Sequence, residues 1–261
     1  MTEPAATPPT PEPAATVIML RQCQDGIEVF MVVRHQKIDF AGGALVFPGG
    51  KVDQADSSAA LALNLEGAAP DISNRALEVA AIRESFEECG ILLAREGTSG
   101  NLVNGSRLEA LGHYRQALHQ GDLTIAEFLQ RENLRLACDQ LAHFAHWVTP
   151  PFMSRRFDTH FFLARAPQDH LAVHDGTEST DSIWIKPAAA IARAHDGLYD
   201  LMFPTHCVLD KLSQYPDIAS AFSAAKTSRA VPVTPWIEQR EDGTWLCITR
   251  DSGYRLIEIK T

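Results

Sequence analysis

The sequence predicts an α/β fold, a domain in which strands and helices are mixed along the chain and share one core. Short apolar runs bounded by turn residues are typical of strands, and longer segments repeat apolar residues at helical spacing. The chain has 261 residues, of which 45% are hydrophobic. This length and composition suit one large domain, or one domain that carries insertions.

The first 15 residues differ from the rest in composition. Prolines recur among Ala, Thr and Glu, at Pro4, Pro8, Pro9, Pro11 and Pro13. Such a segment is typical of disordered or polyproline-like chain. It lacks the basic start and apolar centre of a signal peptide. We therefore expect residues 1–15 to be disordered and residues 16–261 to form a single domain.

In the first half of the chain, the apolar runs fix the expected elements. A turn at Asp25-Gly26 separates two strand-like runs, and Thr124 suits the N-cap of a helix. In order, we expect strands at 16–21, 27–34 and 44–47, a helix at 75–89, a loop at 95–106, and helical spacing across 108–133 that includes a helix at 125–130.

The second half of the chain again mixes the two kinds of segment. Pro187 suits the first position of a helix, and Asp242-Gly243 is a typical hairpin turn. We expect strands at 141–148, 159–164 and 182–186, helices at 187–195, 205–214 and 217–226, and a hairpin around Trp236 and residues 243–248.

The helix at 75–89 carries three carboxylates, Glu84, Glu87 and Glu88, at spacings that place them on one helical face. Ser73 or Asn74 suits its N-cap, and Gly90 suits the position after its end. A separate arc is apolar and should face the core, with the carboxylates directed away from it; that arc consists of Val79, Ile82, Phe86 and Cys89.

Three neighbouring carboxylates repel one another unless a cation lies between them. Hard divalent cations such as Mg²⁺ or Mn²⁺ prefer oxygen ligands, so this face is a candidate metal site. The alternative is a solvated acidic face on an amphipathic helix, which is common. The context upstream of the helix favours the metal site.

That context is Phe47-Pro48-Gly49-Gly50-Lys51-Val52-Asp53, where two glycines follow a strand-like run and allow close backbone approach. Together with the acidic helix it resembles the Nudix box, Gly-x5-Glu-x7-Arg-Glu-U-x-Glu-Glu-x-Gly-U, where U is bulky and apolar. The second half matches, apart from Ser85 at a U position, through Arg83, Glu84, Glu87, Glu88, Gly90 and Ile91.

The first half of the box departs from the pattern. Counting from Gly50, Asp56 stands where the box has its first Glu, and 26 residues separate Asp56 from Arg83 instead of seven. About 19 residues are therefore inserted, near 57–75. An interrupted box is similar to that of the peroxisomal coenzyme A diphosphatases. Further similar segments are Arg34 with 40–50, Trp147-Val148-Thr149-Pro150, and 155–162.

This resemblance implies a Nudix-type α/β/α sandwich with a mixed sheet. The helical spacing across 108–133 indicates a helical insertion near 95–135 that could cover the site. The resemblance also implies Glu84, Glu87 and Glu88 as ligands of Mg²⁺ or Mn²⁺, with the Gly49 carbonyl as a further oxygen. Arg83 would orient a glutamate of the box, and Asp56 would help to hold the loop. A homodimer, common in this fold, stays open.

The general base and the phosphate ligands are less constrained. The family often takes a base from a later loop, which favours Glu178 over Asp181, although 175–180 also has turn composition. Arg34, Arg155 and Arg156 are candidate phosphate ligands, and the two later arginines could instead pair with Asp158.

Three histidines on strand-like segments have a structural interpretation. The spacing of His143, His146 and His160 favours core or rim positions over metal ligation.

Composition argues against several classes of protein. A net charge of −10 opposes non-specific nucleic-acid binding, because that needs a basic surface. No segment reaches the ~18 apolar residues of a membrane span. Five scattered cysteines show no zinc or disulfide pattern, so we expect a cytoplasmic protein.

We therefore expect a metal-dependent diphosphatase. The resemblance favours coenzyme A or acyl-CoA as the substrate, cleaved to 3′,5′-ADP and a 4′-phosphopantetheine product. The alternatives are hydrolysis of ADP-ribose, NADH or a dinucleoside polyphosphate, and a Nudix-fold binding or regulatory module without catalysis. Intact Glu84, Glu87 and Glu88 argue against loss of catalysis.

Overall fold

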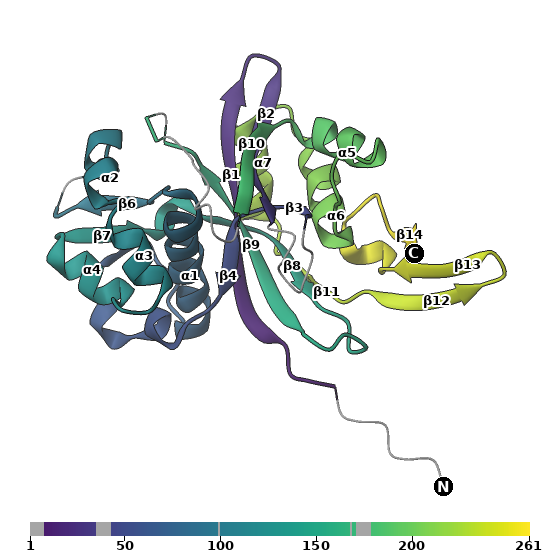
Figure 1. The fold of residues 1–261 in the computed structure, drawn as a ribbon, viewed down its shortest axis with the longest axis horizontal. Coiled ribbons are helices and arrows are strands. Elements are labelled where there is room, and N and C mark those ends of the chain that lie inside the picture. Colours follow the sequence, from purple (N-terminus) through teal and green to yellow (C-terminus); the bar gives the residue numbers. More distant parts are fainter. Residues whose placement is uncertain (1–7, 35–42, 99, 168, 171–178) are drawn as a thin grey trace, which may run out of the picture.

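The computed structural model describes residues 8–34, 43–98, 100–167, 169–170 and 179–261. Its centre is a mixed sheet of eight strands with helices on both faces (Figure 1). The predicted α/β sandwich with a mixed sheet is therefore confirmed.

The main sheet has the strand order β10-β2-β1-β9-β8-β11, with β3 paired to β2 and β4 paired to β1. The pairs β1–β9 and β8–β11 are parallel, and the others are antiparallel. The strands are β1 (Glu12–Cys23), β2 (Gly26–Arg34), β3 (Leu45–Val46), β4 (Gly49–Lys51), β8 (Ala142–Val148), β9 (Phe157–Arg165), β10 (Ser179–Ile185) and β11 (Pro232–Val233).

Strand β1 begins four residues earlier than the expected start at Thr16 and so extends into the segment expected to be disordered. Its first residues have backbone partners on both sides. The amide of Glu12 donates to the Arg156 carbonyl (2.9 Å), and the Pro13 carbonyl accepts from the Val52 amide (3.0 Å). Proline-rich composition does not prevent a strand where proline serves as an acceptor.

Helices cover the two faces of the sheet separately. Alternate residues of β1 show the division: Val17 belongs to the core beneath α1, and Ile18 belongs to the core beneath α6 and α7. The helices are α1 (Ile72–Cys89), α2 (Gly105–Leu111), α3 (Tyr114–His119), α4 (Ile125–Arg131), α5 (Pro187–His195), α6 (Phe203–Leu212) and α7 (Ile218–Thr227).

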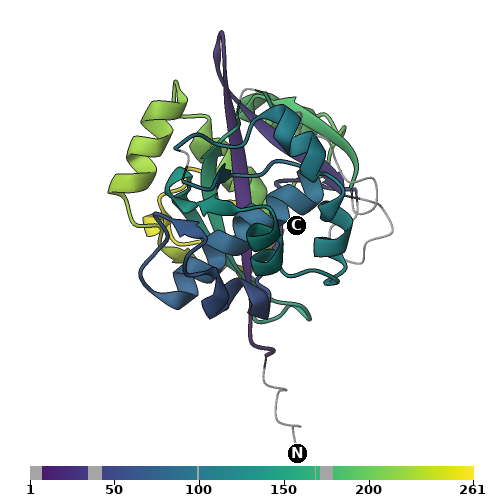
Figure 2. The same cartoon turned by 90° about the vertical axis from the view of Figure 1, so that its left-hand side faces the viewer.

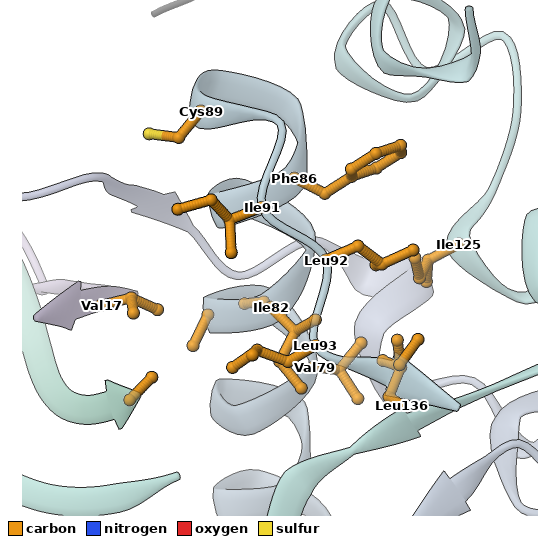
Figure 3. Packing of buried hydrophobic residues seen from close by; sticks show 14 of the residues in the cluster. Val17, Val79, Ile82, Phe86, Cys89, Ile91, Leu92, Leu93, Ile125 and Leu136 are labelled. Carbon is orange, nitrogen blue, oxygen red and sulfur yellow. The ribbon is translucent and has the colours of Figure 1, made fainter. Parts of the chain in front are cut away.

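Helix α1 is buried on two sides, whereas the sequence predicted one (Figure 3). It packs on Val17 of β1, and on its outer side Phe86 stacks on Phe128 of α4 with ring centroids 5.4 Å apart. The second layer comes from the helical insertion, which lies over α1 (Figure 2). Asp71 caps the helix through the Asn74 amide, so the helix begins before the expected caps Ser73 and Asn74.

The insertions near 57–75 and 95–135 contribute to one small sheet that the sequence did not predict. Its order is β5-β7-β6, formed by β5 (Leu65–Glu66), β7 (Leu134–Ala137) and β6 (Ala94–Glu96). The expected helical segment 108–133 is three short helices, of which α4 has a capping box between Thr124 and Glu127. Short 3-10 turns are η1 (Gln54–Ser57), η2 (Ala59–Leu61), η3 (Cys138–Gln140) and η4 (Arg250–Ser252).

The C-terminal part forms a third sheet of β12 (Trp236–Arg240), β13 (Gly243–Cys247) and β14 (Glu258–Lys260). Its first two strands confirm the expected hairpin, with Arg240 opposite Gly243. None of the helices among the described residues has both the length and the apolar composition that a membrane span needs.

Candidate metal-binding active site

The candidate site is built on the last two turns of α1. Gly90 ends the helix in the left-handed conformation (φ 68°), and its amide donates to the carbonyls of Ser85 and Phe86. Glu84, Glu87 and Glu88 precede this end, as the spacing predicted. They do not form a solvated acidic face, because Glu87 is 5% exposed and Glu88 is 9% exposed.

Arg83 lies at the centre of the carboxylates and joins the helix to the box loop. Its Nε and Nη2 donate to the two oxygens of Asp56, both at 2.9 Å. Its Nη1 donates to Glu84 (2.9 Å) and to Glu87 (3.2 Å). Its Nη2 also reaches the Lys51 carbonyl (2.9 Å). Arg83 thus orients two glutamates and closes the interrupted box on itself.

The two glycines of β4 allow the loop to approach α1. A Cβ on Gly50 would lie 2.4 Å from the Glu84 carboxylate, and a Cβ on Gly49 would lie 2.4 Å from the Ala15 carbonyl. The Gly49 amide donates to Glu88 (2.9 Å). Glycine is required at both positions by contact with neighbouring atoms, and Gly49 is next to a predicted ligand.

Burial makes this cluster electrostatically unfavourable as it stands. Desolvation raises the pKa of Glu84 to about 7 and raises the pKa of Glu87 and of Asp56. Three carboxylates, those of Asp56, Glu84 and Glu87, bond to one guanidinium, so ionisation leaves an excess of negative charge that a divalent cation would offset. An all-oxygen donor set of this kind fits Mg²⁺ or Mn²⁺.

The insertion adds two residues that the sequence analysis missed. Arg115 of α3 donates to the carbonyls of Glu87 (3.1 Å) and Glu88 (3.0 Å), and so caps the C-terminal end of α1. His119 of the same helix places Nδ1 3.8 Å from the Glu87 carboxylate. A basic pair at i and i+4 was visible in the sequence, but its docking on α1 was not.

The other predicted residues lie on different elements. Arg156 donates to the carbonyls of Thr149 (3.0 Å) and Pro9 (2.8 Å), so it fastens the N-terminal segment to the β8–β9 hairpin. Arg155 is exposed in the same connection, and Arg34 ends β2. Asp181 is exposed on β10 opposite Val33. Glu178 lies outside the described residues. The site roles of all these residues stay predictions.

Comparison with known proteins gives the family. The model of the NUDT19 Nudix domain matches residues 65–200, slightly more than half of the chain. A putative nudix hydrolase 7 from Caenorhabditis elegans is 29% identical over 208 residues, which cover 78% of this chain and 61% of that protein.

Acyl-coenzyme A diphosphatases named NUDT19 are more distant relatives. That of Xenopus laevis is 25% identical over 204 residues (63% of this chain, 54% of the relative), and that of Homo sapiens is 26% identical over 225 residues (71% and 58%). The chain thus spans between about half and three fifths of the length of these relatives.

A crystal structure confirms the fold assignment. The NUDIX hydrolase from Alicyclobacillus acidocaldarius superposes with a TM-score of 0.72 at 28% identity, covering 84% of this chain and 99% of that one. With the family match and the carboxylate cluster at the end of α1, this shows that the chain belongs to the Nudix hydrolases, in the branch of the NUDT19 Nudix domain.

Proposed function

We propose that this protein is a divalent-metal-dependent diphosphatase that hydrolyses coenzyme A or acyl-CoA to 3′,5′-ADP and the matching 4′-phosphopantetheine. The observation that supports diphosphatase activity is the carboxylate cluster at the end of α1, in which Glu84 and Glu87 accept from Arg83 and Glu88 accepts from the Gly49 amide. The choice of coenzyme A rests on relatives named acyl-coenzyme A diphosphatases.

The chemistry follows from the charge of the substrate. The oxygens of a diphosphate repel a nucleophile, and a bound Mg²⁺ or Mn²⁺ would neutralise that charge and lower the pKa of its water. Glu84, Glu87 and Glu88 are the proposed ligands, with the Gly49 carbonyl as a further one. The reaction adds water across one P–O bond of the bridge and leaves two phosphate monoesters.

The residues around the ligands have positioning roles. Arg83 fixes the carboxylate oxygens of Glu84 and Glu87, and its contact with Asp56 holds the glycine loop against the helix. Glu178 is the proposed base that takes the proton of the attacking water, with Asp181 as the alternative. Arg34, Arg155 and Arg156 are proposed phosphate ligands, although Arg156 must first release its two carbonyl partners.

The test is product analysis by chromatography with Mg²⁺ or Mn²⁺ and a panel of coenzyme A, acetyl-CoA, ADP-ribose, NADH and diadenosine polyphosphates. We expect 3′,5′-ADP from the coenzyme A compounds. Preferential release of AMP from ADP-ribose or NADH would keep the reaction and overturn the substrate.

Two variants serve as controls for the panel. Glu88→Gln should remove the activity, whereas Glu109→Gln, an exposed change on α2, should keep it. Absence of product from every compound, with metal still bound, would favour a binding module. Full activity of Glu88→Gln would overturn the ligand assignment. We also propose a cytoplasmic location, which fractionation of cells would test.

A further inference from the structure

A second group of metal-ligating side chains lies on the β8–β9 hairpin. One ligand atom from each of His146, Asp158 and His160 lies within 4.8 Å of the others. His146 is directly opposite His160 in the antiparallel pair. Asp158 lies two residues before His160 on the same strand and on the same face. Within the described ranges, this is the one set of His, Cys, Asp or Glu found at this spacing. We propose that His146, Asp158 and His160 bind a first-row divalent metal ion of the Zn²⁺ type.

A β-bulge adds a third histidine to this face. The pairing register shifts between His143 and Ala145, so His143 is opposite Phe162 while His146 is opposite His160. In a regular strand, residues three apart point to opposite faces. The bulge cancels that alternation and brings His143 to the side of His146 and His160. Bulges re-aim side chains in this way and are frequent beside functional sites.

His143 acts as a supporting partner for the proposed ligand His160. Its Nε2 lies 3.1 Å from Nδ1 of His160, and the two rings are stacked with centroids 4.9 Å apart. When Nδ1 of His160 donates this hydrogen bond, its Nε2 keeps the lone pair that a metal requires. That nitrogen is the one that lies 3.9 Å from the Asp158 carboxylate. Histidine ligands are usually oriented by such a partner on the other ring nitrogen.

The remaining geometry also suits a metal. His146 already contacts Asp158 through Nε2. Zn²⁺ holds nitrogen and oxygen ligands at about 2.0–2.2 Å, which places ligand atoms about 3.4 Å apart. The His160–Asp158 pair would close from 3.9 Å and the His146–Asp158 contact would open, both by side-chain rotation.

The site is open on one side. Asp158 and His160 line a cavity of about 360 Å³ between the sheet and the start of α1, together with Ser57, Ser73 and Asn74. Two of the three proposed ligands face this cavity, which leaves room for water or a small ligand in a fourth position, as in an open zinc site. This site also differs chemically from the all-oxygen cluster of α1, because it contains two imidazoles and imidazole favours Zn²⁺ over Mg²⁺.

The test is a titration of the chelator-treated full chain with Zn²⁺ in excess Mg²⁺, followed by calorimetry. We expect one Zn²⁺ per chain, still bound when Glu87→Gln and Glu88→Gln are combined to weaken the carboxylate cluster. Co²⁺ in place of Zn²⁺ should give the strong visible absorption of a four-coordinate nitrogen-containing site. Absence of Zn²⁺ binding in excess Mg²⁺ would overturn the proposal.

Variants locate the ion. His146→Ala and His160→Ala should each weaken Zn²⁺ binding by more than about 100-fold, and His143→Gln by about 10–100-fold as a partner of a ligand. Asp158→Asn keeps the size of the side chain and so tests the same site if an alanine variant fails to fold. His195→Ala, an exposed histidine on α5, is the matched control and should bind Zn²⁺ normally. Unchanged binding in His146→Ala and His160→Ala would place the ion elsewhere and refute the site.

Discussion

The carboxylate cluster of α1 and the histidine cluster of β8–β9 lie on the same side of the main sheet and differ in almost every property. The first offers oxygen atoms, is buried and has Arg83 between Glu84 and Glu87. The second offers two imidazoles and one carboxylate that already converge. Among the described residues, the three glutamates do not converge to the same degree.

The difference follows from the geometry of the two secondary structures that carry the side chains. A helix spaces like residues along one face, so it gathers several carboxylates that repel one another and need a hard cation. An antiparallel pair places side chains directly opposite, so two strands bring the imidazoles of His146 and His160 together, and Asp158 adds the one carboxylate of that set. Variants at the two clusters should therefore have independent effects.

The largest expected effect is on catalysis at the carboxylate cluster. Glu87→Gln should reduce hydrolysis of the best substrate by about 1000-fold or more, because metal-assisted stabilisation is worth several kcal/mol and each 1.4 kcal/mol is tenfold. Steady-state kinetics with Mg²⁺ would measure the loss. Zn²⁺ binding at the histidine cluster should not change, and a joint loss would show that the clusters are coupled.

The next effect is on stability. Arg83→Ala removes the one cation among Asp56, Glu84 and Glu87 and should lower the free energy of unfolding by about 3 kcal/mol, as expected for breaking a buried ion pair. Urea unfolding without metal would measure this change. The exposed Arg193→Ala on α5 is the control and should shift stability by less than about 0.5 kcal/mol. Equal stability of both variants would contradict the structural role of Arg83.

The clusters should respond to pH with opposite signs. The folded-state pKa of Glu84 is raised to about 7 from 4.5, so the folded state holds a proton that the unfolded state has lost. Without metal, its effect is that stability falls as pH rises from about 4.5 to about 7. The folded-state pKa of His143 and of His160 is lowered to about 4 from 6.5, so their effect is that stability falls as pH falls from 6.5 toward 4.

Urea unfolding in chelator at pH 5, 6.5 and 8 would separate the two effects. Glu84→Gln should reduce the fall in stability with rising pH. Part of that fall remains because burial also raises the pKa of Glu78 to about 7. His143→Gln should reduce the loss of stability on acidification and leave the fall in stability with rising pH intact. Added Mg²⁺ should stabilise more at pH 8 than at pH 5, where protonated carboxyls bind it poorly. If stability falls just as much with rising pH in Glu84→Gln, burial of this glutamate is not the source of the fall.

The smallest effect tests the insertion. Arg115→Ala removes the donors to the last carbonyls of α1 and should cost about 1 kcal/mol of stability and about tenfold in kcat/KM. Thermal unfolding and kinetics would measure both. Arg131→Ala, exposed at the end of α4, is the matched control. Activity equal to that of the control would show that the insertion does not position the glutamates.

Much of the fold was predictable from local patterns. Helix α5 has the predicted bounds because proline marks its start, and the hairpin at Asp242-Gly243 follows from its turn. The small sheet of β5, β6 and β7 was not predictable, because its strands have two to four residues, which is too short to establish a period. Short strands are stabilised by the partner they pair with.

The sequence by itself determined the donor set of the candidate active site. Helical spacing places Glu84, Glu87 and Glu88 on one face wherever that helix forms, because the backbone period is a local property. It also carried the Nudix assignment, which the family match confirms.

Tertiary structure alone decided what surrounds those donors. The contact of Arg83 with Asp56 crosses 26 intervening residues, and the cap from Arg115 comes from a different insertion. The bulge at β8 decided that His143 joins His146 and His160. Such contacts depend on which distant segments pack together, and local periodicity holds no information about that choice.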